Sequence, residues 1–376
     1  MAEVHGSCDE RFAGVREALA QQLDGEELGA SVAVDLDGRT VVDLWGGYRD
    51  EARTQPWSEH TIVNGWSTTK CVLALAALVL VERGELDLYA PVGNYWPEFS
   101  AKGKKDVQVR HLLSHTSGVS GWERPFSLRD MYDWETATER LAQQRPWWEP
   151  GTASGYHANN QGHLVGEVIR RITNTTVKRF VADSIAGPLG ADFQIGARES
   201  EVSRIAPVVP PAPAADAGTP DPESVEERTF SGPRVPAGAA NSPEWRAADL
   251  GALNGHSNAR GMTTVLRTLS LGGEAGGVRL LSPATVEKVF DQQSDGVDLV
   301  LGAPFRWGMG FCLGSPAVPY VPSGRTCFWG GWGGSLVVMD LDRRLTISYM
   351  MNRMRNGLIG SPHSEACVRA VYDALA

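Results

Sequence analysis

One stretch of the chain departs from the mixed polar and apolar pattern around it. Residues 71–81 are almost all leucine, alanine and valine, which mostly favour helices, and Gly84 after them is suited to a helix C-terminal cap. The stretch is too short to cross a bilayer, which takes about 20 apolar residues. Because its apolar side chains occupy every side, the pattern predicts a helix enclosed by protein.

Alternating and β-rich runs at the two ends of the chain predict strands. Near the start, residues 30–36 and 40–45 flank Asp37-Gly38, a dipeptide typical of tight hairpin turns. Towards the end, strands are predicted at residues 305–313, 326–329, 335–340 and 345–352. Hydrophobic periodicity and capping residues predict helices at residues 9–23, 107–114, 127–145, 161–173, 176–185, 259–271, 283–290 and 364–375.

This order of elements predicts an α+β fold, an α/β sandwich whose antiparallel sheet is built from both chain ends and flanked by helices. Residues 1–70 and 245–376 would form this domain. Residues 71–244 would form an inserted, mostly helical domain that includes a proline-rich loop at 204–223. A cleft between the two domains would place Ser67 at their seam, where binding sites commonly form.

Composition and charge narrow the class of partner. Of the 376 residues, 42% are hydrophobic and 21% charged, as in ordinary globular proteins. A formal net charge of -10 argues against nucleic acid or membrane as the main partner and leaves small molecules. With no Cys-x-x-Cys, His-Glu-x-x-His or similar cluster, neither metal nor cofactor is expected. Five scattered cysteines and an N-terminus without a secretion signal favour a cytoplasmic location.

Polar side chains cluster at the start of the predicted buried helix. Ser67 and Lys70 are three residues apart, so on a helix they share one face and can meet. Desolvation lowers the pKa of a lysine at such a position, and the neutral amine can take the proton of a serine hydroxyl. The positive end of the helix would favour the oxyanion that forms when Ser67 attacks a carbonyl.

The same spacing also has a purely structural interpretation. Serine is a preferred N-cap, and lysine is common on helix surfaces. A Ser-x-x-Lys therefore arises by chance about once in a chain of this size. Two observations favour catalysis: Ser67-Thr-Thr-Lys70 is the one Ser-x-x-Lys in the sequence, and the apolar helix follows it directly.

Three stretches together resemble the serine β-lactamase and penicillin-binding-protein-like superfamily, most closely the family VIII carboxylesterases related to class C β-lactamases. They are Ser67-Thr-Thr-Lys70, Tyr156-His-Ala-Asn159 with the helical run after it, and Trp329-Gly330-Gly331. Residues 111–118 are also similar to a stretch common in that group. The resemblance covers residues 41–353 and implies the same sheet-plus-helical-domain fold. It also implies that Ser67 is the acyl-accepting nucleophile, Lys70 its proton acceptor, and Tyr156 a proton relay whose pKa a charged Lys70 would lower.

The stretch Trp329-Gly330-Gly331 resembles the superfamily in its position but differs from it in its residues. Trp329, Gly330 and Gly331 would bind substrate as an edge strand that lines the cleft. The resemblance implies that the backbone N–H groups of Ser67 and Trp332 form the oxyanion hole. β-Lactamases and peptidoglycan peptidases carry Lys-Thr-Gly in place of Trp329-Gly-Gly331, and its cation and hydroxyl bind a substrate carboxylate. Strong β-lactam hydrolysis is therefore not expected.

Other polar residues near these motifs are not assigned to catalysis. Asn159 stands one place later than the asparagine in the Tyr-x-Asn of class C enzymes, so it is left out of the catalytic set. Structural or surface roles are expected for His111, His115, His157 and His256.

The leading hypothesis is a serine hydrolase that cleaves small or medium carboxylic esters through an acyl-enzyme on Ser67. An acyltransferase that passes the acyl group to an alcohol or amine of a natural product is the alternative. A β-lactamase, a D-amino-acid peptidase or an inactive binding protein is less favoured, since Ser67, Lys70 and Tyr156 are all present but Lys-Thr-Gly is not. No Gly-x-Ser-x-Gly occurs, which disfavours an α/β-hydrolase.

Overall fold

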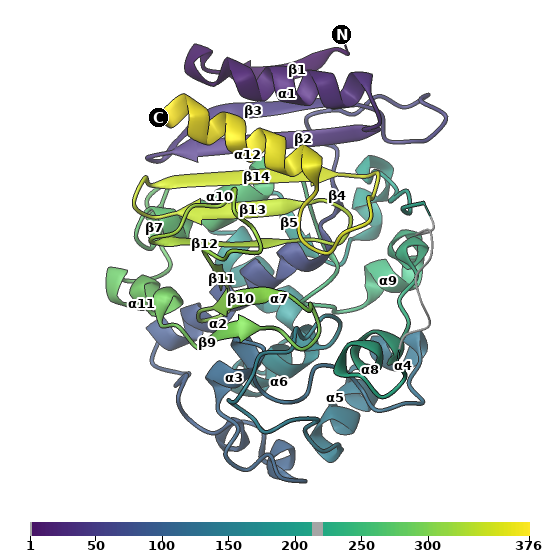
Figure 1. Cartoon of the computed structure of the whole chain (residues 1–376), viewed down its shortest axis with the longest axis vertical. Helices are drawn as coiled ribbons and strands as arrows, with labels where there is room; N and C mark the ends of the chain where they lie inside the picture. Colours follow the sequence, from purple (N-terminus) through teal and green to yellow (C-terminus); the bar gives the residue numbers. More distant parts are fainter. Residues whose placement is uncertain (1, 213–220) are drawn as a thin grey trace.

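The computed structural model describes residues 2–212 and 221–376, and it is organised around a nine-stranded antiparallel sheet (Figure 1). Strands from the start of the chain lie beside strands from its end, as the sequence predicts. In spatial order the strands are β1 (Val4–Cys8), β3 (Arg39–Gly47), β2 (Gly29–Leu36), β14 (Leu345–Met351), β13 (Leu336–Asp340), β12 (Thr326–Gly330), β11 (Cys312–Leu313), β10 (Pro304–Trp307) and β9 (Ser294–Val297).

The two chain ends meet where β2 pairs with β14. Their register runs from Leu36 opposite Leu345 to Ala30 opposite Met351. Both strands are almost wholly buried, as expected for apolar strands in the middle of a sheet that is covered on both faces. The predicted α+β architecture is therefore confirmed.

The strands at the two edges of the sheet were not predicted. β1 reads Val-His-Gly-Ser-Cys and β9 reads Ser-Asp-Gly-Val, and neither has a buried face with alternating apolar residues. The predicted strand 305–313 is also wrong in one respect. It is two strands, β10 and β11, because the chain turns between them at Gly308–Gly310, where Gly310 has a φ of 87°.

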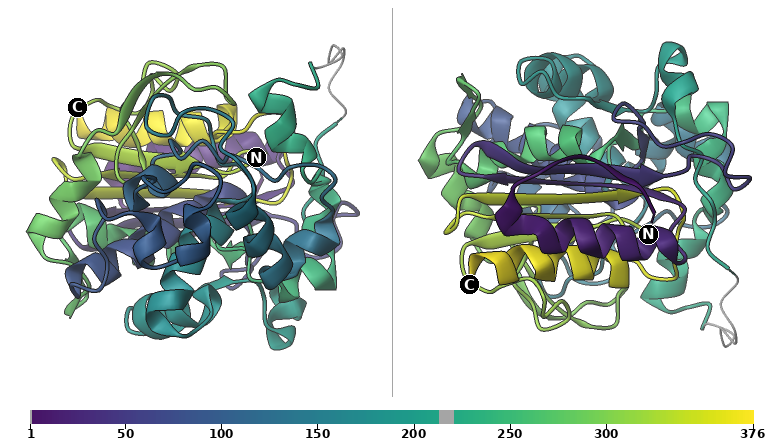
Figure 2. Two further views of the ribbon diagram at one scale, coloured as in Figure 1. Left: turned by 90° about the horizontal axis from the view of Figure 1, so that it is seen from below. Right: turned by 90° about the horizontal axis from the view of Figure 1, so that it is seen from above.

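Helices cover both faces of the sheet. On one face, α1 (Ala13–Asp24) and α12 (Pro362–Leu375) lie side by side (Figure 2). On the other face, α10 (Ala259–Ser270) packs against β14, β2 and β13. The remaining described helices are α2 (Thr69–Glu82), α3 (Val109–Leu113), α4 (Leu128–Tyr132), α5 (Trp134–Gln143), α6 (Gln161–Thr173), α7 (Val177–Val181), α8 (Val225–Ser231), α9 (Pro243–Ala247) and α11 (Pro283–Glu287), with short helical turns between them.

The helix α2 is the enclosed helix that the sequence predicts. Every residue from Thr69 to Leu80 is buried, and the helix packs against α6, α10 and α11. Gly84 follows it with a φ of 71°, the left-handed conformation expected of a C-terminal cap. Among the described residues, no helix is long and apolar enough to cross a membrane.

Two small sheets complete the described strands. β5 (Phe193–Ile195) pairs with β6 (Gly255–Ser257), which also pairs with β4 (Val63–Asn64), and β7 (Glu274–Ala275) pairs with β8 (Val278–Arg279). The division into a domain of residues 1–70 and 245–376 and a helical domain of residues 71–244 stays a prediction. Part of the predicted proline-rich loop, residues 213–220, lies outside the described residues.

Candidate active site

A strained turn carries Ser67 into the start of α2. Trp66, the residue before it, has a φ of 51°, a left-handed conformation that is costly for a bulky side chain. Packing holds it there, because the buried Trp66 ring contacts Trp245 and Trp332 at centroid distances of 5.3 and 5.0 Å. The turn therefore fixes the position of the Ser67 side chain, which is 7% exposed.

The amine of Lys70 meets the Ser67 hydroxyl, as the spacing predicts. Lys70 Nζ lies 3.1 Å from Ser67 Oγ and donates to the carbonyl oxygens of Ala158 at 2.8 Å and Ala252 at 3.1 Å. Burial lowers the pKa of Lys70 well below its usual range. A neutral amine has two N–H donors and one lone pair. Three acceptors would equally suit the three N–H donors of a charged amine, so it is burial that favours the neutral form. In that form two N–H groups bind the carbonyls and the lone pair faces the Ser67 proton.

The structure also brings Tyr156 to Ser67. Both residues line the same cavity, and the Ser67 side chain acts on the phenol as a hydrogen-bonding group that lowers its pKa; the phenol oxygen also accepts a hydrogen bond from Trp329 Nε1 at 3.0 Å. The predicted direction of its pKa shift is wrong, however. Burial raises the pKa of the Tyr156 phenol and outweighs the opposite effect of these hydrogen bonds, and a neutral Lys70 supplies no charge to lower it.

These groups form one contiguous polar cluster. The Trp329 indole donates to the Tyr156 oxygen, the Ser67 side chain acts on the Tyr156 phenol, and Ser67 can donate to Lys70 once that amine is neutral. The side chains of the cluster are buried, which strengthens the interactions between them. The arrangement prepares the Ser67 oxygen to attack an electrophile as its proton moves to Lys70.

Two backbone amides at the site have no hydrogen-bond partner within the part of the chain that the structure describes. Among the hydrogen bonds of the described residues, none uses the N–H of Ser67 or of Trp332. Gly331, just before Trp332, lies close to the strained turn. A Cβ on Gly331 would be 2.3 Å from the Gly65 carbonyl oxygen and 2.2 Å from Ser335 Oγ. Glycine there lets the end of β12 approach the turn that carries Ser67.

The expectation of an edge strand at Trp329–Gly331 is wrong for the strand as a whole, because β12 pairs with β13 on one side and β11 on the other. β11 is short, however, and pairs with Cys327 and Phe328 alone, so β12 extends past it at Trp329 and Gly330. Trp329 is 2% exposed and does not line the cavity beside Ser67. Its contact is with Tyr156, so it positions the phenol.

A cavity of about 720 Å³ opens beside Ser67. Its walls are mostly apolar and come from several segments. The lining residues are Trp66, Ser67, Tyr156, Ala158, Asn159, Phe230, Arg234, Val235, Pro236, Leu253, Trp332 and Leu358. Asn159, which was left out of the expected catalytic set, contributes to the wall, and its amide nitrogen donates to the Pro233 carbonyl at 3.4 Å.

The model of the family described as Beta-lactamase matches residues 15–362 of this chain, which is most of its length. The chain belongs to the Beta-lactamase family. The superfamily expected from the three stretches is thereby confirmed. Among the residues that the structure describes, no group of three or more His, Cys, Asp or Glu side chains could hold a metal ion.

Several known proteins are similar to it over nearly their whole length. The crystal structure of a family VIII carboxylesterase shares 37% sequence identity, with a TM-score of 0.92 and coverage of 99% of this chain and 100% of that chain. Esterase/beta-lactamase LipL of Mycobacterium tuberculosis is 30% identical, covering 96% of this chain and 86% of the relative. Esterase EstB of Burkholderia gladioli is 30% identical, covering 92% of this chain and 91% of the relative.

In this Beta-lactamase family member, Asp298 anchors Tyr156 in a way that the sequence did not reveal. Asp298 is fully buried, and its Oδ1 accepts the backbone N–H of Tyr156 at 2.9 Å. Its Oδ2 accepts Trp307 Nε1 at 3.3 Å, and the Trp307 ring stacks on the Tyr156 ring at 6.1 Å. No motif links Asp298 to Tyr156, since the contact joins residues 142 apart in the chain.

His111, His115, His157 and His256 are buried, and none of them contacts Ser67 or Lys70 through a hydrogen bond among the described residues. His115 is the nearest to the site, since its ring packs edge-on against Tyr156 at 5.0 Å and its Nδ1 accepts the backbone N–H of His157. Burial lowers the pKa of His111 and His256 to about 4 and of His157 to about 3. They are neutral at physiological pH and support the structure.

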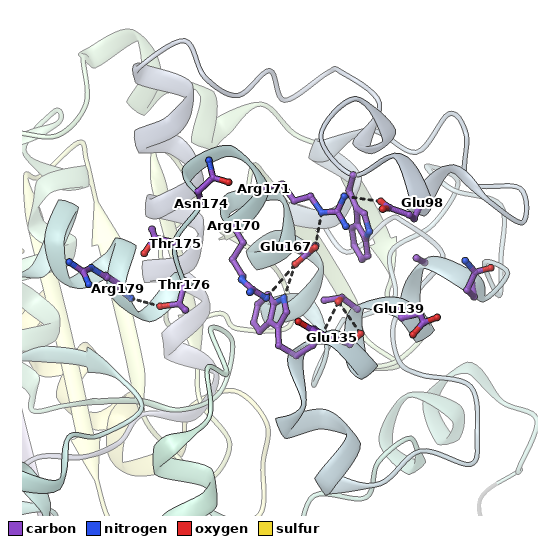
Figure 3. A pocket seen from close by; sticks show the side chains of 15 residues that line it. Glu98, Glu135, Glu139, Glu167, Arg170, Arg171, Asn174, Thr175, Thr176 and Arg179 are labelled. Carbon is purple, nitrogen blue, oxygen red and sulfur yellow. Dashed lines mark hydrogen bonds and ion pairs between the residues drawn. The ribbon is translucent and has the colours of Figure 1, made fainter.

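A second hollow, of about 850 Å³, lies between α5, α6 and α7 (Figure 3). It is lined by charged side chains that largely neutralise one another. Glu167 accepts hydrogen bonds from Trp134 and Arg171, and Arg171 also pairs with Glu98. None of its lining residues belongs to the Ser67 site. This hollow holds a structural ion-pair network.

Proposed function

We propose that this protein is a serine carboxylesterase that cleaves small or medium carboxylic esters through an acyl-enzyme on Ser67. The observation that carries the proposal is the buried cluster in which Lys70 Nζ meets the Ser67 hydroxyl and Trp329 holds the Tyr156 phenol beside them. Its position at the wall of a mostly apolar cavity fits uncharged esters. The esterase relatives support the same class of reaction.

In the proposed acylation step, Lys70 takes the Ser67 proton as Oγ bonds to the ester carbonyl carbon. The carbonyl oxygen becomes an oxyanion, which the N–H groups of Ser67 and Trp332 would bind. The C–O bond to the alcohol then breaks. The departing alcohol oxygen takes a proton through the Tyr156 hydroxyl, which remains protonated near neutral pH because burial raises its pKa.

Deacylation repeats these roles with water as the nucleophile. Water loses a proton to the Lys70 and Tyr156 pair and attacks the acyl carbonyl, and the Ser67 oxygen leaves with a proton. One ester and one water give one acid and one alcohol, and no metal or cofactor takes part in the proposed cycle. A cytoplasmic location is part of the proposal, supported by the five cysteines, all of which are free thiols.

Acyl transfer is the second candidate, and one observation favours it. The cavity beside Ser67 is mostly apolar, so an alcohol or amine with an apolar body can occupy it and compete with water for the acyl group. Loss of Lys-Thr-Gly argues against β-lactams in either case. A substrate carboxylate would forgo the charge-assisted hydrogen bond that the lysine of Lys-Thr-Gly supplies, about 1.5–3 kcal/mol, a penalty of roughly ten- to hundredfold.

One panel experiment tests these proposals. The wild-type protein and Ser67→Ala are incubated with short-chain aryl and alkyl esters, a chromogenic cephalosporin, acceptor alcohols and amines, and a serine-reactive phosphonate, and mass spectrometry reads products and adducts. The expected result is one phosphonate adduct on Ser67, faster turnover of neutral esters than of the cephalosporin, and no adduct on Ser67→Ala. An adduct that still forms on Ser67→Ala would show that Ser67 is not the nucleophile. Acylated acceptor in excess of free acid makes transfer the main reaction.

A further inference from the structure

One charged side chain lines the cavity beside Ser67. Among the described lining residues, Arg234 alone carries a charge, and its neighbours in the cavity wall are Phe230, Val235 and Pro236. All four belong to the end of α8 and the segment after it, so this part of the chain supplies both an apolar wall and a cation. In β-lactamases the carboxylate-binding lysine belongs to Lys-Thr-Gly, whose place is taken here by Trp329 on β12. Arg234 therefore comes from a different segment of the chain than that lysine.

The Arg234 guanidinium keeps donors for a ligand. Its Nη2 donates to Glu227, a residue that is 8% exposed and does not line the cavity. No hydrogen bond from its Nε or Nη1 is present among the described residues. A guanidinium has five N–H donors arranged to bind a carboxylate through two of them. The side chain of Arg234 is 69% exposed, so it lies at the solvent side of the cavity.

We infer that Arg234 selects esters that carry a carboxylate at the end remote from the reacting carbonyl, such as half-esters of aliphatic dicarboxylic acids. The inference rests on the proposed esterase function. Such a substrate would place its carbonyl at Ser67, its methylene groups along the apolar wall, and its carboxylate at Arg234. A mostly apolar cavity with Arg234 as its one charged lining residue among those described matches this distribution of groups.

This preference differs from β-lactam recognition. In a β-lactam the carboxylate lies close to the reacting carbonyl, whereas a half-ester separates the two groups by several methylenes. The expected gain is modest, because the guanidinium is exposed to water and already pairs with Glu227. Charge pairs at such positions change binding by up to about fivefold.

The test uses two series of 4-nitrophenyl esters. One series carries a terminal carboxylate on acyl chains of increasing length, and the other carries the corresponding methyl ester in its place. For each length the measured quantity is the ratio of kcat/KM for the anionic ester to kcat/KM for the neutral one. The ratio cancels any change in catalysis that is common to both esters.

The expected ratio in the wild-type protein has a maximum at one chain length and falls as salt is raised from 0.05 to 0.5 M, since salt screens exposed charges. Arg234→Gln lowers that maximum about two- to fivefold. Glu227→Gln raises it, because the guanidinium loses its competing carboxylate. Arg228→Gln is the matched control, since Arg228 lies on α8, six residues before Arg234 in the chain, pairs with Glu123 and does not line the cavity.

The results distinguish failure of the Arg234 inference from failure of the proposed esterase function. An equal fall for both ester series in Arg234→Gln, or an unchanged ratio, overturns the inference and leaves the esterase function intact. A ratio that falls as much in Arg228→Gln also overturns it, because a general surface charge would then be responsible. Absence of ester turnover by the wild-type protein overturns the proposed function, and the inference with it.

Discussion

At the scale of single residues, the pKa shifts of Lys70 and Tyr156 set the protonation states of the site. Burial lowers the pKa of Lys70 and raises that of Tyr156, so near neutral pH an uncharged amine can coexist with an uncharged phenol. Burial thereby favours the uncharged form of both side chains. The base and the acid of the proposed reaction are then present together.

The expected pH dependence follows from these directions. As pH falls through the pKa of Lys70, the amine gains a proton and can no longer accept one from Ser67, so kcat/KM for a neutral ester decreases. On the alkaline side the rate stays level up to about pH 10, because the phenol remains protonated. The measurement is a pH–rate profile at constant ionic strength. A bell-shaped profile with an alkaline limb below pH 9 would contradict this assignment.

The sequence predicted the residues of this site better than their interactions. Ser67 and Lys70 could be placed together because their contact is local to one helix turn. Tyr156 required a family resemblance, because 89 residues separate it from Ser67. Asp298 and the cavity residue Arg234 were missed because neither belongs to a motif and both act through contacts that only the fold creates. The pKa direction of Tyr156 was wrong because its burial could not be read from the sequence.

At the scale of elements, the end of β12 and the turn before α2 depend on each other. Gly331 lies where the space for a side chain is taken by the Gly65 carbonyl oxygen and by Ser335. Sequence reasoning assigned the glycines here to substrate approach, whereas the structure shows close packing against the turn that carries Ser67. The same glycine therefore serves the geometry of the nucleophile.

Gly331→Ala tests this dependence. We expect the free energy of unfolding to fall by about 1–3 kcal/mol, because backbone atoms must shift to admit the methyl group. We also expect kcat/KM to fall about tenfold or more, because the displaced turn moves Ser67. Gly238→Ala is the control, since a Cβ there meets nothing within 4 Å. Urea unfolding and ester kinetics on both variants give the two quantities, and equal behaviour of the variants would contradict the prediction.

At the scale of the whole molecule, the site is assembled from parts of the chain that lie far apart in sequence. Ser67 and Lys70 come from the turn before α2 and its first residues, Tyr156 from the loop before α6, and Trp329 from β12. Asp298 follows β9 at the far edge of the sheet and binds the backbone of the Tyr156 loop. The Leu299 N–H also donates a hydrogen bond to the Ser154 carbonyl. Two hydrogen bonds therefore join this edge of the sheet to the Tyr156 loop.

Asp298→Asn tests whether that connection positions the phenol. The Asp298 carboxylate accepts the indole N–H of Trp307 with one oxygen and backbone N–H groups, including that of Tyr156, with the other. An amide has one oxygen, so one of these donors must face an NH₂ group. Leaving one buried donor unpaired costs about 1–3 kcal/mol of stability. The Tyr156 ring loses part of its support, and we expect kcat to fall about tenfold while KM changes little.

The matched control is Asp295→Asn, the same substitution at an exposed position of β9 whose carboxylate lies 3.8 Å from Arg306. It should leave the unfolding free energy and kcat within about 0.5 kcal/mol and twofold of the wild-type values. Kinetics are measured well below the unfolding transition of each variant, so that lost activity reflects the folded state. If Asp298→Asn unfolds more easily but keeps its kcat, then Asp298 stabilises the sheet edge without positioning Tyr156. In that case Trp329 and Trp307 are sufficient to hold the phenol against Ser67.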